Sequence, residues 1–181
     1  MIARLIVENR EFLAPWEPVR GGDYFTVAAQ RELIAAGLKR KALGISLPHV
    51  ILDEQGDVVG RITVNDIVRG PFQSGSVGYW VSQKANGRGL ATAALSNMKR
   101  IAFTELGLHR LEAGTLTHNI RSQRVLERNG FERFGLAPSY LKIAGEWRDH
   151  VLFQAINPIP DDAPAAWRAT HTGALRSVPR R

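Results

Sequence analysis

The sequence predicts a single α/β (α+β) domain in which helices flank a mixed β-sheet. Short runs rich in Val, Ile and aromatic residues alternate with longer stretches of helical apolar spacing, which is the pattern of such a domain. A length of 181 residues, with 44% hydrophobic and 23% charged residues, suits one globular unit with a sizeable core. Glycine and proline clusters separate the runs and supply the turns between them.

The N-terminal third is predicted to form a loop, a helix and a hairpin. Two prolines interrupt any helix across residues 12–18, so Trp16 is expected on a loop that is a candidate wall of a substrate site. Apolar residues at loose helical spacing predict a helix from residue 23 to about residue 43. Two β-rich runs, 49–53 and 58–64, flank a turn-forming segment and are expected to pair antiparallel.

The middle of the chain is predicted to contain a strand followed by a long helix. After a break at residues 69–72, residues 76–82 predict a strand in which Gly78 permits a close approach or a bulge. A helix is predicted over residues 91–106 and is stopped by Gly107. Its apolar stripe consists of Ala91, Leu95, Met98, Ala102 and Leu106.

The last part of the domain is predicted to be mostly strands. These strands are expected at residues 109–117, at 131–134 with an extension over 140–143, and at 147–156. Asn119 is expected to cap a short helix that Asn129 and Gly130 close. The domain is therefore predicted to span residues 1–156, followed by a tail over residues 157–181 that is rich in Pro, Ala and Arg.

Composition excludes several classes of function. The chain has no cysteine, and its five histidines form no ligand-spaced cluster, so neither a disulfide nor a metal site is expected. No segment reaches the roughly 18 consecutive apolar residues of a membrane span, and we expect a cytoplasmic protein without a membrane partner. The formal net charge of +7 suits anionic partners. We interpret Arg121, Arg124 and Arg128 as a solvated basic face rather than a dedicated nucleic-acid site, because no RNA-reading motif accompanies them.

A glycine-rich turn over residues 86–91 is the strongest candidate functional site. It leads from a predicted strand into a predicted helix, where unpaired backbone N–H groups and the positive end of the helix dipole meet. Gly87 and Gly89 would let the backbone approach a pyrophosphate closely. The turn is not a dinucleotide fingerprint, because it lacks the third glycine, and no Gly-Lys-Ser/Thr follows it as in a nucleoside-triphosphate loop.

With its surroundings, this turn resembles the acetyl-CoA motif of the GNAT acetyltransferases, Q/R-x-x-G-x-G/A. Gly89 and Ala91 stand at fixed places of the motif, and Asn86 replaces the usual Gln or Arg. Downstream, residues 119–131 are similar to the family's N-x-x-S…V-L-E-x-x-G-F block. Two motifs in the right order are far more specific than one. The resemblance covers roughly residues 5–156 of the chain.

Within that family, the chain is most similar to the ribosomal-protein-alanine N-acetyltransferases of the RimJ and RimL type, and above all to the RimJ branch, through residues 9–18, 68–72 and 140–152. The resemblance implies the GNAT fold: a central mixed, mostly antiparallel twisted sheet flanked by helices, with acetyl-CoA as co-substrate in a splay between two central strands. The coenzyme contacts that it implies are Trp80, Val81, Ser82, Asn86, Gly87, Arg88, Gly89, Leu90, Ala91, Thr92, Asn119 and Ser122.

The implied reaction is direct attack of a neutral amine on the thioester. The resemblance implies the N-terminal α-amine of a protein, such as a ribosomal protein, as the acceptor. Deprotonating an α-amine at pH 7 costs about 1.4 kcal/mol, against roughly 5 kcal/mol for a lysine, so such an acceptor needs little help from a base. The backbone N–H of Val81 is the candidate oxyanion donor, and Ser122 is a candidate donor to the leaving thiolate. Ser76 stands where many relatives have a glutamate, so the base is left open between Glu112 and Glu17.

Trp16, Glu17 and Tyr140 are the candidates for binding the acceptor. Two alternatives remain open, an acetyltransferase for a small amine such as an antibiotic, and an acyl-CoA-binding domain without turnover.

Only residues 1–8 precede the Asn-Arg-Glu-Phe-Leu segment, where members of the family usually carry a further strand and helix, so we expect an exposed sheet edge. The sequence leaves open whether the chain forms a homodimer.

Overall fold

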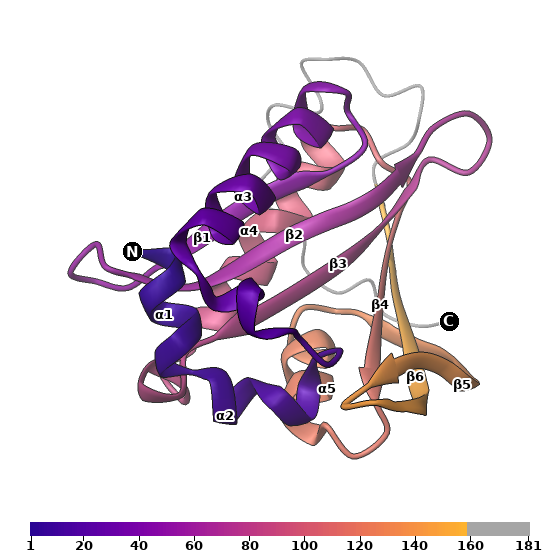
Figure 1. The fold of residues 1–181 in the computed structure, drawn as a ribbon. Helices are drawn as coiled ribbons and strands as arrows, with labels where there is room; N and C mark the ends of the chain where they lie inside the picture. Colours follow the sequence, from indigo (N-terminus) through magenta and orange to yellow (C-terminus); the bar gives the residue numbers. More distant parts are fainter. Residues whose placement is uncertain (159–181) are drawn as a thin grey trace.

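Six strands form one mixed sheet in the computed structural model, which describes residues 1–158 (Figure 1). Their order is β1-β2-β3-β4-β6-β5, and every neighbouring pair is antiparallel except β3 with β4. The strands are β1 (Leu47–Leu52), β2 (Val58–Val68), β3 (Ser74–Val81), β4 (Arg110–Leu116), β5 (Glu132–Ile143) and β6 (Glu146–Ile156). The predicted mixed, mostly antiparallel sheet is therefore confirmed.

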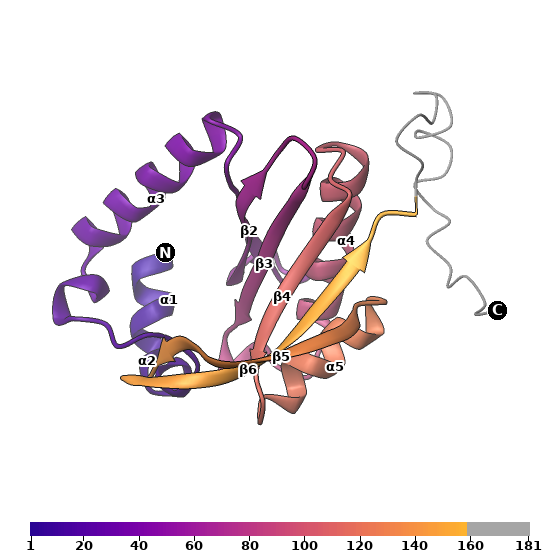
Figure 2. The same cartoon turned by 90° about the vertical axis from the view of Figure 1, so that its right-hand side faces the viewer.

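Helices cover both faces of this sheet (Figure 2). On one face lie α4 (Leu90–Thr104) and α5 (Ile120–Arg128), and on the other lie α1 (Ile2–Glu8), α2 (Arg10–Leu13) and α3 (Val27–Ala42). Three short 3-10 helices are η1 (Ala14–Trp16), η2 (Gly22–Phe25) and η3 (Gln83–Ala85). The main core lies between α4 and the sheet, where Leu95, Met98 and Phe103 of α4 form one buried cluster with Leu111 and Phe153.

Two helices begin and end as their local sequence predicts. α4 buries Leu95 and Met98 of the predicted stripe, and Gly107, with a φ of 62°, follows its last turn. α5 starts after Asn119, whose side-chain oxygen accepts a hydrogen bond from the backbone N–H of Ser122 at 3.1 Å. The amide of Asn119 thereby satisfies a donor that the first turn of the helix leaves unpaired.

The N-terminal segment is helical where a loop is predicted. α1, α2 and η1 follow one another, so most of residues 12–18 is helical and the loop begins only after Trp16. Pro15 is accommodated because it stands at the start of η1, where its missing N–H leaves no helical hydrogen bond unmade. Ile6 and Leu13 are buried and attach these helices to the domain.

α3 stands away from the sheet rather than packing flat against it (Figure 2). The predicted helix is confirmed, but it is divided from η2 at Thr26, whose hydroxyl accepts a hydrogen bond from the N–H of Ala29 and caps α3. Gln30 is the one buried residue of α3, and Leu33 is 45% exposed. The apolar stripe of this helix is therefore not a core face, because its spacing is too loose to align along one side.

One edge of the sheet agrees with the sequence-based expectation and the other differs from it. β1 is an edge strand, and its outer side pairs with no strand within residues 1–158, as expected. β5 at the other edge is one strand rather than two pieces. Register shifts between Arg133 and Gly135 and between Ala137 and Leu141 explain why its sequence looks interrupted.

The end of the described part of the chain is attached to the core. Asn157 is buried, and its amide donates hydrogen bonds to the carbonyls of Phe103 and Leu108. From residue 159 onward, the predicted tail lies outside the described residues. Among the helices of the described part, none combines the length and the apolar character needed to cross a membrane.

Candidate functional site

The two parallel strands in the middle of the sheet separate soon after they meet. β3 and β4 pair over only three positions, from Ser74 with Arg110 to Ser76 with Glu112. β3 continues to Val81 and β4 to Leu116, so the edges that face each other beyond Ser76 and Glu112 have no strand between them. This opening is the splay that the family resemblance implies.

The backbone N–H of Val81 points into the splay. The next residue, Ser82, donates its N–H to the carbonyl of Val59 on β2 at 2.7 Å. Successive N–H groups of a strand point to opposite sides, so the N–H of Val81 faces away from β2 and toward the opening. A donor in this position is directed at an edge that an extended ligand could occupy.

The glycine turn at the end of β3 has the conformation that an anion site needs. Gly87 and Gly89 have φ values of 79° and 78°, in the left-handed region that favours glycine. α4 begins at Leu90, and the Gly89 carbonyl accepts the hydrogen bond of Ala93 that starts the helical ladder. The N–H groups before Ala93 have no partner in the helix, so they and the helix dipole favour an anion at this point.

Two adjoining cavities connect the glycine turn with the splay. The turn cavity has a volume of about 450 Å³ and is lined by Val81, Ala85, Asn86, Gly87, Gly89, Leu90, Ala91, Thr92, Arg121, Arg124, Val125 and Arg128. The splay cavity has a volume of about 160 Å³ and is lined by Phe12, Leu13, Trp16, Tyr79, Trp80, Val81, Asn86, Ala91, Asn119, Arg121, Ser122 and Val125. They share five lining residues, and together they collect ten of the twelve residues predicted to contact the coenzyme.

The other two predicted contacts, Ser82 and Arg88, line a separate cavity of about 240 Å³ beside the β1–β2 hairpin. The Arg88 guanidinium lies 3.8 Å from Asp53 and 3.7 Å from Glu54, measured between nitrogen and carboxylate oxygen. These two acidic side chains turn Arg88 toward the hairpin. Its side-chain charge is therefore partly neutralised there.

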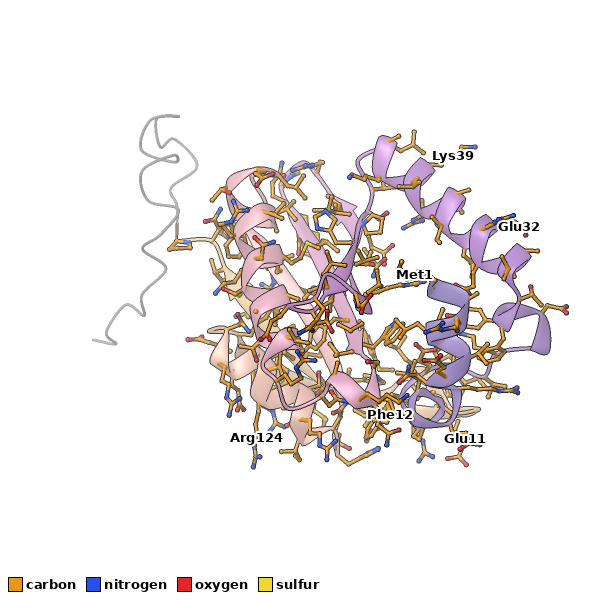
Figure 3. All side chains as sticks on the ribbon, turned by 90° about the vertical axis from the view of Figure 1, so that its left-hand side faces the viewer. Met1, Glu11, Phe12, Glu32, Lys39 and Arg124 are labelled. Carbon is orange, nitrogen blue, oxygen red and sulfur yellow. The ribbon has the colours of Figure 1, made fainter. Side chains whose placement is uncertain are left out.

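Three arginines of α5 supply positive charge to the turn cavity instead. Arg121, Arg124 and Arg128 are exposed, lie on one side of α5 and all line this cavity. Arg124 extends from the outer surface of the helix (Figure 3). Within residues 1–158 none of the three forms an ion pair with a carboxylate. Their charge is thus available to an anionic ligand.

Ser122 has a hydrogen-bond partner that the sequence does not reveal. The hydroxyl of Tyr79 lies 3.1 Å from the hydroxyl of Ser122 and 3.3 Å from its carbonyl oxygen. Burial raises the pKa of Tyr79 to about 12, although the hydrogen bond to Ser122 opposes the rise. Strand alternation could have indicated Tyr79, because it places Tyr79 and Trp80 on opposite faces and so directs Tyr79 toward the helices above β3.

Glu112 is engaged by a neighbouring cation. It stands at the last paired position of the parallel strands, and its carboxylate lies 2.7 Å from the Nε of Arg110. Its register partners are Ser76 on β3 and Gln154 on β6, which share its face of the sheet. Because core residues Leu111 and Ala113 point the other way, Glu112 faces away from α4 and α5.

Glu17 borders a fourth cavity, formed by the N-terminal segment. This N-terminal cavity has a volume of about 290 Å³ and is lined by Ile6, Arg10, Leu13, Ala14, Glu17, Pro18, Val19, Arg20, Phe25 and Ala144. Burial raises the pKa of the Glu17 carboxyl, while the charges of Arg20 and Arg61 oppose the rise. Of the predicted catalytic residues, Ser122 lines the splay cavity and Glu17 the N-terminal cavity, whereas Glu112 lines neither.

The aromatic candidates lie around the splay cavity and near the end of β4. Trp16 lines the splay cavity and packs against His118, with ring centroids 5.5 Å apart. Tyr140 is 48% exposed, packs against His150 at the same centroid distance and approaches Gly114 of β4. No group of three or more His, Cys, Asp or Glu side chains that could hold a metal ion occurs in the described part of the chain.

Comparisons with known proteins show the family to which the chain belongs. A family model described as an acetyltransferase (GNAT) domain matches residues 2–132. A probable N-acetyltransferase of Bacillus subtilis, YjcK, is 36% identical over 152 residues, covering 83% of this chain and 84% of that protein. The ribosomal protein uS5-alanine N-acetyltransferase of Escherichia coli is 34% identical over 158 residues, covering 87% and 81%. The solved structure of Mycobacterium smegmatis RimJ in complex with CoA-disulfide superposes with a TM-score of 0.82 at 34% identity, covering 94% of this chain and 82% of that one.

The chain belongs to the GNAT family and is an acyltransferase with the GNAT fold. More particularly, it is an acetyltransferase close to the ribosomal-protein-alanine N-acetyltransferases, and its structural neighbours include Mycobacterium smegmatis RimJ.

Proposed function

We propose that this protein transfers the acetyl group of acetyl-CoA to the N-terminal α-amine of a protein, by direct attack of the amine on the thioester. The observation that carries the proposal is the convergence of the Val81 N–H, the Ser122 hydroxyl and the glycine turn on two adjoining cavities. An acyl-CoA needs these three parts: an anion site for its phosphates, a channel for its pantetheine arm, and donors at its thioester.

The coenzyme would bind with its pyrophosphate at the N–H groups of residues 87–92 and its phosphates within reach of the α5 arginines. The pantetheine arm would lie along the free edge of β3, where it can pair with the backbone as an added strand does. This orientation brings the thioester near the N–H of Val81. Mycobacterium smegmatis RimJ, which is 34% identical, is known in complex with CoA-disulfide.

The chemistry would depend on hydrogen-bond donors more than on a strong base. As the amine nitrogen bonds to the thioester carbon, the Val81 N–H stabilises the oxyanion and the Ser122 hydroxyl stabilises the departing sulfur. An α-amine is deprotonated often enough near neutral pH to need only a weak base. Glu17 suits such a role through water, because a raised carboxyl pKa brings it closer to neutral pH.

The acceptor would enter from the side of the N-terminal helices and β5–β6. Trp16, Glu17 and Tyr140 are the side chains that we assign to it. A ribosomal protein is the favoured class of acceptor, because the E. coli relative is named for alanine acetylation of ribosomal protein uS5. A peptide that begins with alanine is accordingly the first acceptor to test.

A peptide panel tests the proposal. CoA release from acetyl-CoA is measured with an alanine-initiated peptide that also contains a lysine, with the same peptide blocked by an N-terminal acetyl group, and with a polyamine and an aminoglycoside. We expect turnover on the free peptide, loss of it on the blocked peptide, and a single acetyl group on the N-terminal residue by mass spectrometry. Equal rates on the blocked peptide, or turnover of the small amines alone, would refute a protein N-terminus as acceptor.

A further inference from the structure

We propose that Tyr79 is a positioning residue for acyl transfer, which orients the Ser122 hydroxyl toward the sulfur of the coenzyme. The proposal rests on the proposed function and extends it to a residue of β3. It starts from a contact between two residues separated by 43 positions in the sequence, on a strand and a helix that both border the splay cavity.

The contact leaves the Ser122 proton available to a ligand. The Ser122 hydroxyl can donate one hydrogen bond and accept others. When Tyr79 donates to the Ser122 oxygen, across the 3.1 Å that separates them, the serine's own O–H is free to turn into the cavity. The carbonyl of Ser122, at 3.3 Å, is the more distant of the two acceptors that Tyr79 can reach.

Without the phenol, Ser122 has a competing partner. A serine in the first turn of a helix can donate its hydroxyl to a backbone carbonyl three or four residues earlier, and the carbonyl of Asn119, three residues before Ser122, is the first that accepts a helical hydrogen bond, from Gln123. Donation to that carbonyl would direct the proton along the helix axis and away from the cavity. Tyr79 therefore affects the reaction by selecting one orientation of a neighbouring hydroxyl.

The phenol is suited to this role because it remains protonated. Burial holds the pKa of Tyr79 at about 12, so the phenol is a donor throughout the pH range in which an amine nucleophile is available. Its ring packs against the hydrophobic core, which fixes the position of the hydroxyl. The Ser122 backbone is fixed as well, by the hydrogen bond that its N–H donates to Asn119.

In the transfer step, the amine nitrogen forms a bond to the thioester carbon and the carbon–sulfur bond breaks, with its electron pair moving to sulfur. The Ser122 O–H donates a hydrogen bond to the developing thiolate, which then takes a proton from water. The nitrogen loses one proton to water, directly or through a base. Protons therefore balance, and Tyr79 and Ser122 end the step as they began it.

A double-mutant cycle tests this role. Tyr79→Phe, Ser122→Ala and the double variant are compared with the wild-type enzyme, and Tyr24→Phe serves as control because the Tyr24 hydroxyl makes no hydrogen bond within residues 1–158. We expect each single variant to lose about tenfold in kcat with KM for acetyl-CoA nearly unchanged, and the double variant to lose no more than Ser122→Ala. Multiplicative losses, or an unchanged kcat with a lower Tm in Tyr79→Phe, would overturn the proposal.

A second measurement needs no acceptor and so separates this proposal from the proposed function. The thiol of bound CoA is titrated by the ultraviolet absorbance of its thiolate, with desulfo-CoA as blank. A donor at the sulfur favours the charged form, so we expect a thiol pKa below that of free CoA in the wild-type protein and in Tyr24→Phe, and a return toward the free value in Tyr79→Phe and Ser122→Ala. If no acceptor is turned over, the proposed function fails while this pattern still supports the positioning role. The same thiol pKa in all four proteins, or no CoA binding, would refute it.

Discussion

The side-chain oxygen of Asn9 accepts a hydrogen bond from the backbone N–H of Gln83 at 2.8 Å. The amide nitrogen of the same buried side chain donates to the carbonyl of Leu5, also at 2.8 Å. Asn9 thus joins the end of α1 to the first residue of η3, and η3 leads directly into the glycine turn. A residue at the start of the chain therefore supports the candidate coenzyme site.

Asn9→Ala is expected to lower the free energy of unfolding by about 1–3 kcal/mol, because it removes a buried side-chain amide that makes two hydrogen bonds. We also expect a higher KM for acetyl-CoA, since η3 would be less firmly held. Chemical denaturation and steady-state kinetics measure the two effects. The exposed Asn97→Ala on α4 is the control and should leave KM unchanged without lowering stability, because alanine is the stronger helix former. An unaltered KM in a destabilised Asn9→Ala would show that the link stabilises the fold alone.

Gly60 allows β2 to approach β3 beside the splay. A Cβ at this position would lie 2.2 Å from the carbonyl oxygen of Trp80 and 3.0 Å from the Cα of Val81. We expect Gly60→Ala to cost about 1–3 kcal/mol of stability and to lower kcat by displacing the Val81 N–H. Gly78→Ala on the adjacent strand meets no atom within 4 Å and is the control for stability. Equal Tm values for the two variants would contradict this expectation.

Gly89 combines a backbone requirement with a binding requirement. Both Gly89 and Gly107 have positive φ and no atom within 4 Å of an added Cβ, so alanine at either position costs about 1–2 kcal/mol of backbone strain. Only Gly89→Ala adds a methyl group at the anion site. We expect its KM for acetyl-CoA to rise about tenfold or more, while Gly107→Ala loses stability alone. The affinity of both variants for CoA is measured by calorimetry. Equal affinities would contradict the assignment of the pyrophosphate to this turn.

The α5 arginines should act on the coenzyme through charge. Arg124→Gln is expected to raise KM for acetyl-CoA about threefold at low ionic strength, with a smaller effect at high salt because exposed charges are screened. Arg31→Gln on exposed α3 makes the same change of charge on the other face of the sheet. KM measured over a salt series compares the two variants. Identical salt dependence for both would mean that net charge matters and the position of Arg124 does not.

Glu17 is expected to trade stability for function. Burial raises its folded-state pKa above the ordinary value of 4.5, so ionisation of this carboxyl opposes folding. The penalty is absent at low pH, where the group is protonated in both states, and it appears as the pH rises through the folded pKa. Glu17→Gln should therefore raise Tm at pH 7 but not at pH 4, and should lower kcat on the alanine-initiated peptide. Glu11→Gln, on the exposed side of α2, is the control. A lower Tm for Glu17→Gln at pH 7 would show that the ionised carboxylate stabilises the fold, contrary to this prediction.

Local patterns predicted the elements that depend on local interactions. The stripe through Leu95 and Met98 predicted α4, and Asn119 predicted the start of α5, because burial periodicity and capping each involve residues within a few positions. The glycine turn was predicted for the same reason. Its anion-binding geometry requires only consecutive residues with left-handed φ followed by a helix.

Contacts between distant segments could not be predicted in this way. Tyr79 meets Ser122, and Asn9 meets Gln83, only because separate elements fold together. The sequence likewise drew attention to Gly78, whereas the close approach of the backbones occurs at Gly60, since it is fixed by strand register. For the same reason the sequence did not show that two candidate catalytic residues lie apart. Glu112 faces away from α4 and α5, whereas Ser122 is on α5.

The short parallel pairing of β3 with β4 divides the sheet into two halves that are only weakly joined. One three-stranded half, β1-β2-β3, lies on one side and the other, β4-β6-β5, lies on the opposite side, and within residues 1–158 their strands pair at three positions. An extended ligand that binds the free edge of β3 would act as an added strand between the two halves of the sheet. The two halves would then move least relative to each other when the acyl donor is bound. The rigidity of the enzyme would therefore depend on the concentration of the acyl donor.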